Sequence, residues 1–302
     1  MIQRRYSLVL IVIAILAAAL LVYAARKEFI EAISNVSILF LGLVYLATLS
    51  QNVTLWLVFH ASIGAGGLYL DTAKMHFGGQ VAKYLPGKVW ALVYQATLKS
   101  DGVPFGHIVQ GNIVLYALSI VSVVFSCLAL IAYPASLSIA AAVLLAGAAV
   151  SAYFMSSDHL YRLIQRFSRL SARFELSNTP AKTDFPVATR IVVYIILVVT
   201  YVLSYVFLLY AFFDFDIHQA LRLTAYLGIA WLAGVAVAIS PSGFGVREAV
   251  FIGIGQISDE NSFELYASIA IVARVIQVGQ DLLSAFLVPG IVGLYFNRSR
   301  SP

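Results

Sequence analysis

The chain has 302 residues, of which 61% are hydrophobic and 11% are charged, and its formal net charge is +5. Soluble domains average about 25% charged residues, so this composition excludes an ordinary soluble globular protein. The basic residues cluster where membrane topology would place them, so the charge does not indicate nucleic-acid binding. Repeated apolar runs of about 20 residues predict an all-α, polytopic helical membrane protein.

The apolar runs predict about seven or eight long transmembrane helices. The first run follows a basic start that resembles a signal peptide, but its length and the spans that follow favour an uncleaved helix. The long spans that we expect are Ser7–Ala24, Val36–Phe59, His107–Ala132, Ala135–Phe154, Ala188–Phe213, Leu223–Ser240 and Phe263–Pro289. The single cysteine, Cys127, lies inside one of these spans, which excludes an intrachain disulfide and favours a buried core residue.

A polar segment, residues 158–187, separates two membrane halves, residues 1–157 and 188–302, which together form one membrane domain. Its apolar residues and its arginines recur on different faces at helical spacing, which favours an amphipathic helix at the membrane interface over a solvated linker. The positive-inside rule places this segment and both chain termini in the cytoplasm of a multi-pass cell-membrane protein. That topology requires further crossings in the less apolar stretches 63–98 and 243–258.

Two interruptions of the apolar pattern look alike. One contains Pro86–Gly87 and the other Pro241-Ser242-Gly243, and their prolines lie 27 and 28 residues after the ends of the spans Val36–Phe59 and Ala188–Phe213. Proline removes a backbone donor, and irregular backbone at membrane depth survives only where protein or a water-filled cavity surrounds it. Paired broken segments at matching places in two halves are typical of transporter binding sites. We therefore predict an inverted pseudo-repeat whose two broken or re-entrant segments approach each other near the bilayer midplane.

The residues around these breaks predict an anion site. A half-helix that begins after such a break presents free N–H groups and a positive dipole end. In the last span, Arg274, Gln277 and Asp281 share one helical face, and ionisable residues at membrane depth normally face a bundle interior or an aqueous path. No catalytic residue, metal or cofactor is predicted. The predicted substrate-binding residues are Lys83, Pro86, Gly87, Lys88, Pro241, Gly243, Gly245, Arg247, Glu248, Arg274, Gln277 and Asp281.

Each charged group also has a simpler interpretation. Arg247 and Glu248 are compatible with an ordinary cytoplasmic loop, and the carboxylate of Glu248 with compensation of a helix dipole. Lysines at the first break are able to snorkel to the membrane interface. Arg274 and Asp281 are compatible with a structural ion pair in which each neutralises the charge of the other.

The motifs Leu85-Pro86-Gly87-Lys88 and Pro241-Ser242-Gly243-Phe244-Gly245-Val246-Arg247-Glu248 resemble those of the lysylphosphatidylglycerol synthase transmembrane (flippase-like) family. The resemblance covers essentially the whole chain and implies an integral membrane protein that moves lipids between leaflets. The best-known members also carry a soluble aminoacyl-transferase domain. No room for that domain is expected in the 13 residues after Pro289, so synthesis of an aminoacyl lipid is not predicted.

The resulting hypothesis is a lipid flippase or transporter, not an enzyme, whose partners are membrane lipids, either an anionic phospholipid or a polyprenyl-phosphate lipid. One alternative is a membrane-embedded glycosyltransferase that uses a lipid-linked sugar, because Asp214 and Asp216 mimic a metal-binding Asp-x-Asp pair, although such a pair is more often a cap or turn. Another is an accessory scaffold of cell-envelope biosynthesis. Each of these three hypotheses is compatible with a homo-oligomer or with an envelope-biosynthesis partner.

Overall fold

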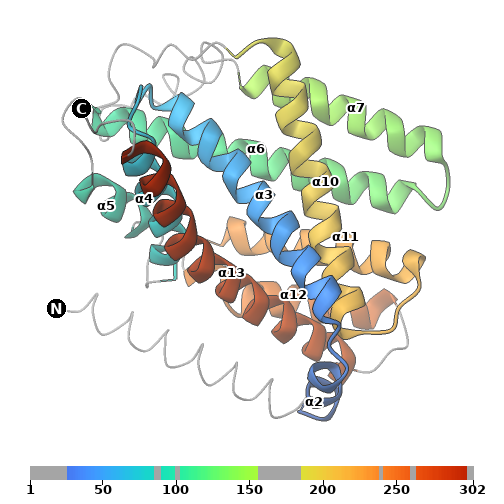
Figure 1. Ribbon diagram of the computed structural model, residues 1–302. Coiled ribbons are helices and arrows are strands. Elements are labelled where there is room, and N and C mark those ends of the chain that lie inside the picture. The colour runs from blue at the N-terminus through green and yellow to red at the C-terminus, as the bar shows by residue number, and fades with distance from the viewer. Residues whose placement is uncertain are drawn as a thin grey trace, which may run out of the picture.

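The computed structural model describes residues 26–84, 90–98, 103–155, 185–237, 241–258 and 263–297. Throughout these residues the regular structure is helical, as predicted, and no strand occurs in them. The helices are α2 (Arg26–Ser34), α3 (Ile38–Ser62), α4 (Tyr69–Ala82), α5 (Trp90–Thr97), α6 (Phe105–Ala132), α7 (Leu137–Phe154), α10 (Val187–Phe212), α11 (Ile217–Ala236), the short 3-10 turn η1 (Pro241–Gly243), α12 (Val246–Ser258) and α13 (Phe263–Asn297) (Figure 1).

Four helices in the described part of the chain are long and apolar enough to cross a membrane, namely α3, α6, α10 and residues Phe263–Tyr295 of α13. The predicted spans for these four are therefore confirmed. Helix α7 forms a shorter apolar helix over the predicted span Ala135–Phe154. The predicted span Ser7–Ala24, most of the basic segment 158–187, and the Pro86–Gly87 break lie outside the described residues.

Two predicted boundaries differ most from the structure. Helix α11 begins at Ile217, six residues before the predicted start, because Asp216 caps it and its side chain accepts hydrogen bonds from the N–H groups of His218 and Gln219. Helix α13 continues through Pro289 to Asn297. A proline inside a membrane helix does not have to end it, because neighbouring groups satisfy the backbone carbonyl that the proline leaves without a donor.

The two halves show the same order of elements. In the first half a long helix (α3), a shorter one (α4), a short one (α5) and a long one (α6) follow each other, and α10, α11, α12 and α13 repeat this order. The packing repeats as well, since α4 packs on α13 just as α11 packs on α6, and α3 packs on α10. In Figure 1, α3 and α10 cross with opposite chain directions. This is the arrangement expected of an inverted repeat.

The apolar core forms several clusters, one where the two halves meet and another among the helices of the second half. Phe59 of α3, Leu118 of α6 and Leu197 of α10 are fully buried in one cluster, and Phe251 of α12 and Tyr266 of α13 are buried in another. Large apolar side chains are also exposed along the outer faces of α7 and α13. An apolar exterior of this kind is suited to contact with lipid chains rather than water.

Candidate functional site

The second break is a tight turn that depends on its glycines. Gly243 and Gly245 have φ angles of +72° and +82°, in the left-handed region that favours glycine, and Ser242 has a φ of 50°. A Cβ atom on Gly243 would lie 2.8 Å from the Cα atom of Gly234 in α11. A Cβ atom on Gly234 would lie 2.4 Å from Cγ of Arg247. These glycines therefore bring the turn against α11 and leave a channel for the Arg247 side chain.

Glu248 occupies the first turn of α12 and is 6% exposed. Its Oε2 atom accepts a hydrogen bond from the Gly245 N–H at 2.6 Å, and its Oε1 atom accepts one from Arg274 Nε at 2.5 Å. A side-chain carboxylate thus sits at the N-terminal end of α12, where it compensates the helix dipole. Because the Glu248 carboxylate already occupies the N-terminus of α12, the positive charge that would bind an anionic ligand has to come from side chains.

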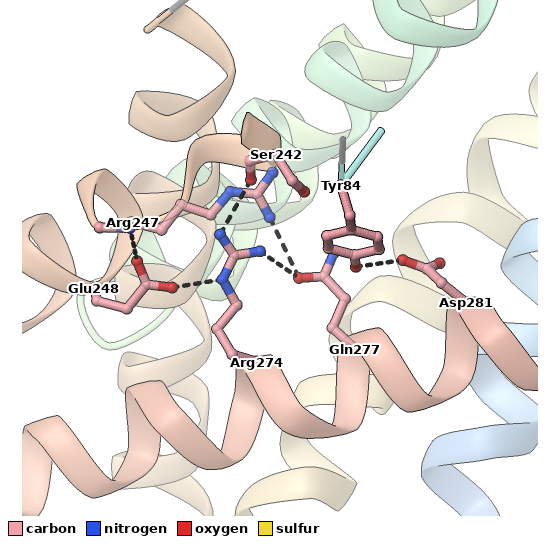
Figure 2. A network of polar contacts seen from close by, with 8 residues as sticks. Tyr84, Ser242, Arg247, Glu248, Arg274, Gln277 and Asp281 are labelled. Atoms are coloured by element: carbon pink, nitrogen blue, oxygen red, sulfur yellow. Dashed lines mark hydrogen bonds and ion pairs between the residues drawn. The ribbon is translucent and has the colours of Figure 1, made fainter. Parts of the chain in front are cut away.

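Arg274 is held from three directions and is 9% exposed. Besides its ion pair with Glu248, it donates through Nη1 to Gln277 Oε1 at 3.2 Å and through Nη2 to the Ser242 carbonyl at 3.1 Å (Figure 2). This arginine therefore ties α13 to the turn and to α12. Its partner is Glu248, so a mutual neutralisation of Arg274 and Asp281 does not occur.

Arg247 is held much more loosely. Its Nη1 atom donates to Gln277 Oε1 at 3.4 Å, and its guanidinium lies 5.7 Å from the centre of the Trp231 ring. Its Nε atom is buried without a hydrogen-bond partner, and no carboxylate among the described residues pairs with it. The Arg247 cluster (Ser242, Arg247, Glu248, Arg274 and Gln277) therefore holds two guanidinium groups and one carboxylate.

A second group, the Asp281 cluster, joins the two halves. Asp281 is 5% exposed, and its Oδ2 atom accepts from Lys83 Nζ at 2.8 Å and from the Tyr84 hydroxyl at 2.6 Å. Lys83 also donates to Gln80 Oε1 at 2.8 Å. The contact links the last helix to the residues just before the first break, and it leaves one positive and one negative charge matched.

Both clusters adjoin one cavity of about 400 Å³ that is lined by residues of both halves. Such a volume lies within the range of about 300–1,000 Å³ typical of small-molecule sites. Of the predicted site residues, four line it directly: Lys83, Arg247, Gln277 and Asp281. Arg274 and Glu248 lie behind this wall, in a small adjoining space of about 30 Å³.

The remaining predicted residues have other places. The backbone of Pro241, Gly243 and Gly245 shapes the turn and does not line the large cavity. Pro86, Gly87 and Lys88 lie outside the described residues, although Gln80 and Lys83 before them and Gln95 after them line the cavity. The described residues on both sides of the first break thus line the same polar space as Ser242 of the second break.

Several cavity residues were not predicted from the sequence, above all Gln51 and Asn52 of α3, Asn112 of α6 and Gln280 of α13. Gln51 and Asn52 are two adjacent carboxamides in an otherwise apolar span, and this is the signal that marks them. Polar residues inside a membrane helix usually face the bundle interior. His76 of α4 is also on the wall, and its Nε2 atom has no partner among the described residues.

The Asp214–Asp216 pair lies away from this cavity. Asp216 forms a capping box with Gln219 at the start of α11, and neither aspartate lines the cavity. The described position of Asp216 therefore agrees with the cap interpretation of this pair.

The fold and site together define a class: a helical membrane protein with a polar, charged cavity between two structurally corresponding halves. Comparison of the chain with protein-family models, with curated proteins and with solved structures finds no match. The function is therefore inferred from the cavity itself.

Proposed function

We propose that this protein is a lipid flippase or transporter of the cell membrane that moves an anionic or lipid-linked head group between leaflets through the polar cavity. The observation that carries the proposal is a guanidinium, that of Arg247, on the wall of a cavity inside an apolar helical bundle, with no carboxylate partner among the described residues. An uncompensated charge at membrane depth is costly, so its presence is explained best by a ligand of opposite charge.

The charge balance of the wall favours an anion. Among the described lining residues the cations are Lys83 and Arg247, and the only carboxylate is Asp281, which Lys83 already neutralises. A phosphate is well suited to the remaining guanidinium, because arginine donates two parallel hydrogen bonds to phosphate oxygens.

The position of the cavity favours translocation. It lies at the contact of two halves with opposite chain direction, and alternating access in such proteins moves one repeat against the other around a fixed site. Acyl or polyprenyl chains would remain in the bilayer beside the apolar outer faces while the head group crosses. The sequence contains no P-loop motif, so the proposed movement follows a gradient, couples to ions or equilibrates the leaflets.

The resemblance to the lysylphosphatidylglycerol synthase transmembrane family points in the same direction, and membership of that family is part of the proposal. The topology, with both termini in the cytoplasm, is also part of the proposal. It is supported by the basic residues near the ends of the chain and in segment 158–187.

The test is leaflet exchange in liposomes that contain the purified protein. A labelled anionic phospholipid and a labelled polyprenyl phosphate are placed in one leaflet, and exchange is followed by chemical quenching of the outer label. We expect exchange well above that of protein-free liposomes, and a loss of about 10- to 100-fold in Arg247→Gln, since a hydrogen bond to a charged group contributes about 1.5–3 kcal/mol.

Arg222→Gln is the matched control, because Arg222 lies on α11 but does not line the cavity. We expect this variant to exchange lipid at the wild-type rate. If wild-type protein exchanges none of the tested lipids, or if the two variants lose equally, the proposed function is wrong.

A further inference from the structure

The cavity wall is unusually rich in carboxamides. The chain has 16 glutamine and asparagine residues in all, and seven of them line this one space. They come from five helices, so no single amphipathic helix accounts for them. They are Gln51 and Asn52 on α3, Gln80 on α4, Gln95 on α5, Asn112 on α6, and Gln277 and Gln280 on α13.

Some of these amides are used within the protein. Asn112 Nδ2 donates to Gln95 Oε1 at 2.7 Å, and Gln80 and Gln277 accept from the basic residues beside them. Polar contacts of this kind also hold membrane helices together. Gln51, Asn52 and Gln280 are different, because their side chains donate no hydrogen bond to another described residue, and Gln280 Nε2 is buried without a partner.

An unpaired amide at membrane depth costs free energy, about 1–3 kcal/mol for each buried group that lacks a partner. A carboxamide both donates and accepts, as a hydroxyl does. A wall with several such groups is therefore complementary to a ligand with several hydroxyls. Apolar tails would leave these groups unsatisfied.

The carboxylates on or near the wall are already occupied. Asp281 accepts from Lys83 and Tyr84, and Glu248 accepts from Arg274 and the Gly245 N–H. Trp231, an aromatic residue of the wall, already faces Arg247. Within the described residues, an ammonium-bearing head group would thus find no free carboxylate, whereas a phosphate would find Arg247.

We infer that the head group recognised in this cavity is a phosphate ester carrying a hydroxyl-rich, uncharged polyol or sugar, with the phosphate at Arg247 and the hydroxyls at the carboxamides of α3 and α13. This inference depends on the proposed function only in taking the ligand to be a lipid. The shared chemistry, a polyol phosphate, is also found in soluble sugar phosphates.

The test measures binding in detergent, separately from transport. Four lipids with identical short acyl chains are titrated: phosphatidylinositol, phosphatidic acid, phosphatidylethanolamine and an uncharged monoglycosyl diacylglycerol. Inositol phosphate without chains serves as a soluble fifth probe. The apparent Kd of each is taken from the rise in unfolding temperature, because a ligand that binds the native state stabilises it.

We expect phosphatidylinositol to bind about tenfold more tightly than any other lipid of the panel, since two further hydrogen bonds account for a tenfold change. The double variant Gln51→Leu/Gln280→Leu should remove this advantage and leave the affinity for phosphatidic acid within about twofold. Gln256→Leu is the control, because Gln256 is exposed on α12 and does not line the cavity.

Equal affinity for phosphatidic acid, or tightest binding of phosphatidylethanolamine, would overturn the inference even if the double variant did not fold. If the inositol phosphate without chains bound as tightly as the lipid, the ligand would be a soluble ester of the same chemistry. Selective binding without leaflet exchange would leave the inference standing and refute the transport proposal. Leaflet exchange at the same rate for every head group would refute the inference and leave the transport proposal standing.

Discussion

The two charged clusters of the cavity differ in how completely their charges are paired. In the Asp281 cluster one ammonium and one carboxylate meet at 2.8 Å, and a tyrosine hydroxyl completes the site. In the Arg247 cluster, Glu248 is bound to Arg274 and to the backbone, and Arg247 is left with a 3.4 Å contact to Gln277. The comparison separates a structural link between the halves from a group that is free to hold a ligand.

The largest expected effect is on stability and comes from Arg274→Met. The variant leaves the buried carboxylate of Glu248 without its ion-pair partner, and breaking a buried pair in this way costs about 3–5 kcal/mol. Chemical unfolding in detergent measures the loss. In Arg274→Met/Glu248→Gln both charges are gone, and most of the stability should return. Wild-type stability of the single variant would show that the pair does not hold α12 to α13.

Asp281→Asn should have a smaller effect on the free energy of unfolding, about 1–3 kcal/mol. Lys83 keeps its bond to Gln80, and its side chain is 23% exposed, so it is less dependent on the lost carboxylate. The same unfolding assay compares the two clusters directly. A loss as large as that of Arg274→Met would mean that the halves are held together mainly by the Asp281 cluster.

Gly234→Ala tests the channel through which Arg247 reaches the cavity. The new methyl group would collide with Cγ and Nε of Arg247, and overpacking of this kind costs about 1–3 kcal/mol. We expect lipid exchange to fall as well, because the guanidinium is displaced. Gly253→Ala on α12 is the matched control, since its methyl group meets no atom within 4 Å and alanine favours the helix. Equal behaviour of the two variants would contradict the packing argument.

The smallest effect is expected for Asp216→Ala, because Asp216 belongs to neither cluster and does not line the cavity. Loss of the α11 cap costs about 0.5–2 kcal/mol. Lipid exchange should be unchanged at a temperature where the variant is folded. If exchange or any sugar transfer were abolished in folded protein, Asp216 would have a chemical role beyond its cap.

Much of this architecture follows from the sequence, because apolar periodicity specifies helices and proline with glycine specifies breaks. The shared face of Gln277 and Asp281 is likewise fixed by helical spacing. The polar partners are not, because the Tyr84 hydroxyl donates to Asp281 across 197 positions of sequence, and that hydrogen bond depends on how α4 packs on α13. The two adjacent carboxamides of α3 stand out in an apolar span, but only the packing of five helices shows that they share one wall with the other carboxamides.

The measurement that tests the central claim most directly compares Arg247→Gln with Lys83→Gln in the leaflet-exchange assay. Both residues line the cavity, and each substitution removes one positive charge. If the unpaired guanidinium holds the anionic head group, Arg247→Gln should slow exchange about 10- to 100-fold, and Lys83→Gln less than about threefold. Equal losses, or a loss confined to Lys83→Gln, would contradict the assignment of the anion to Arg247.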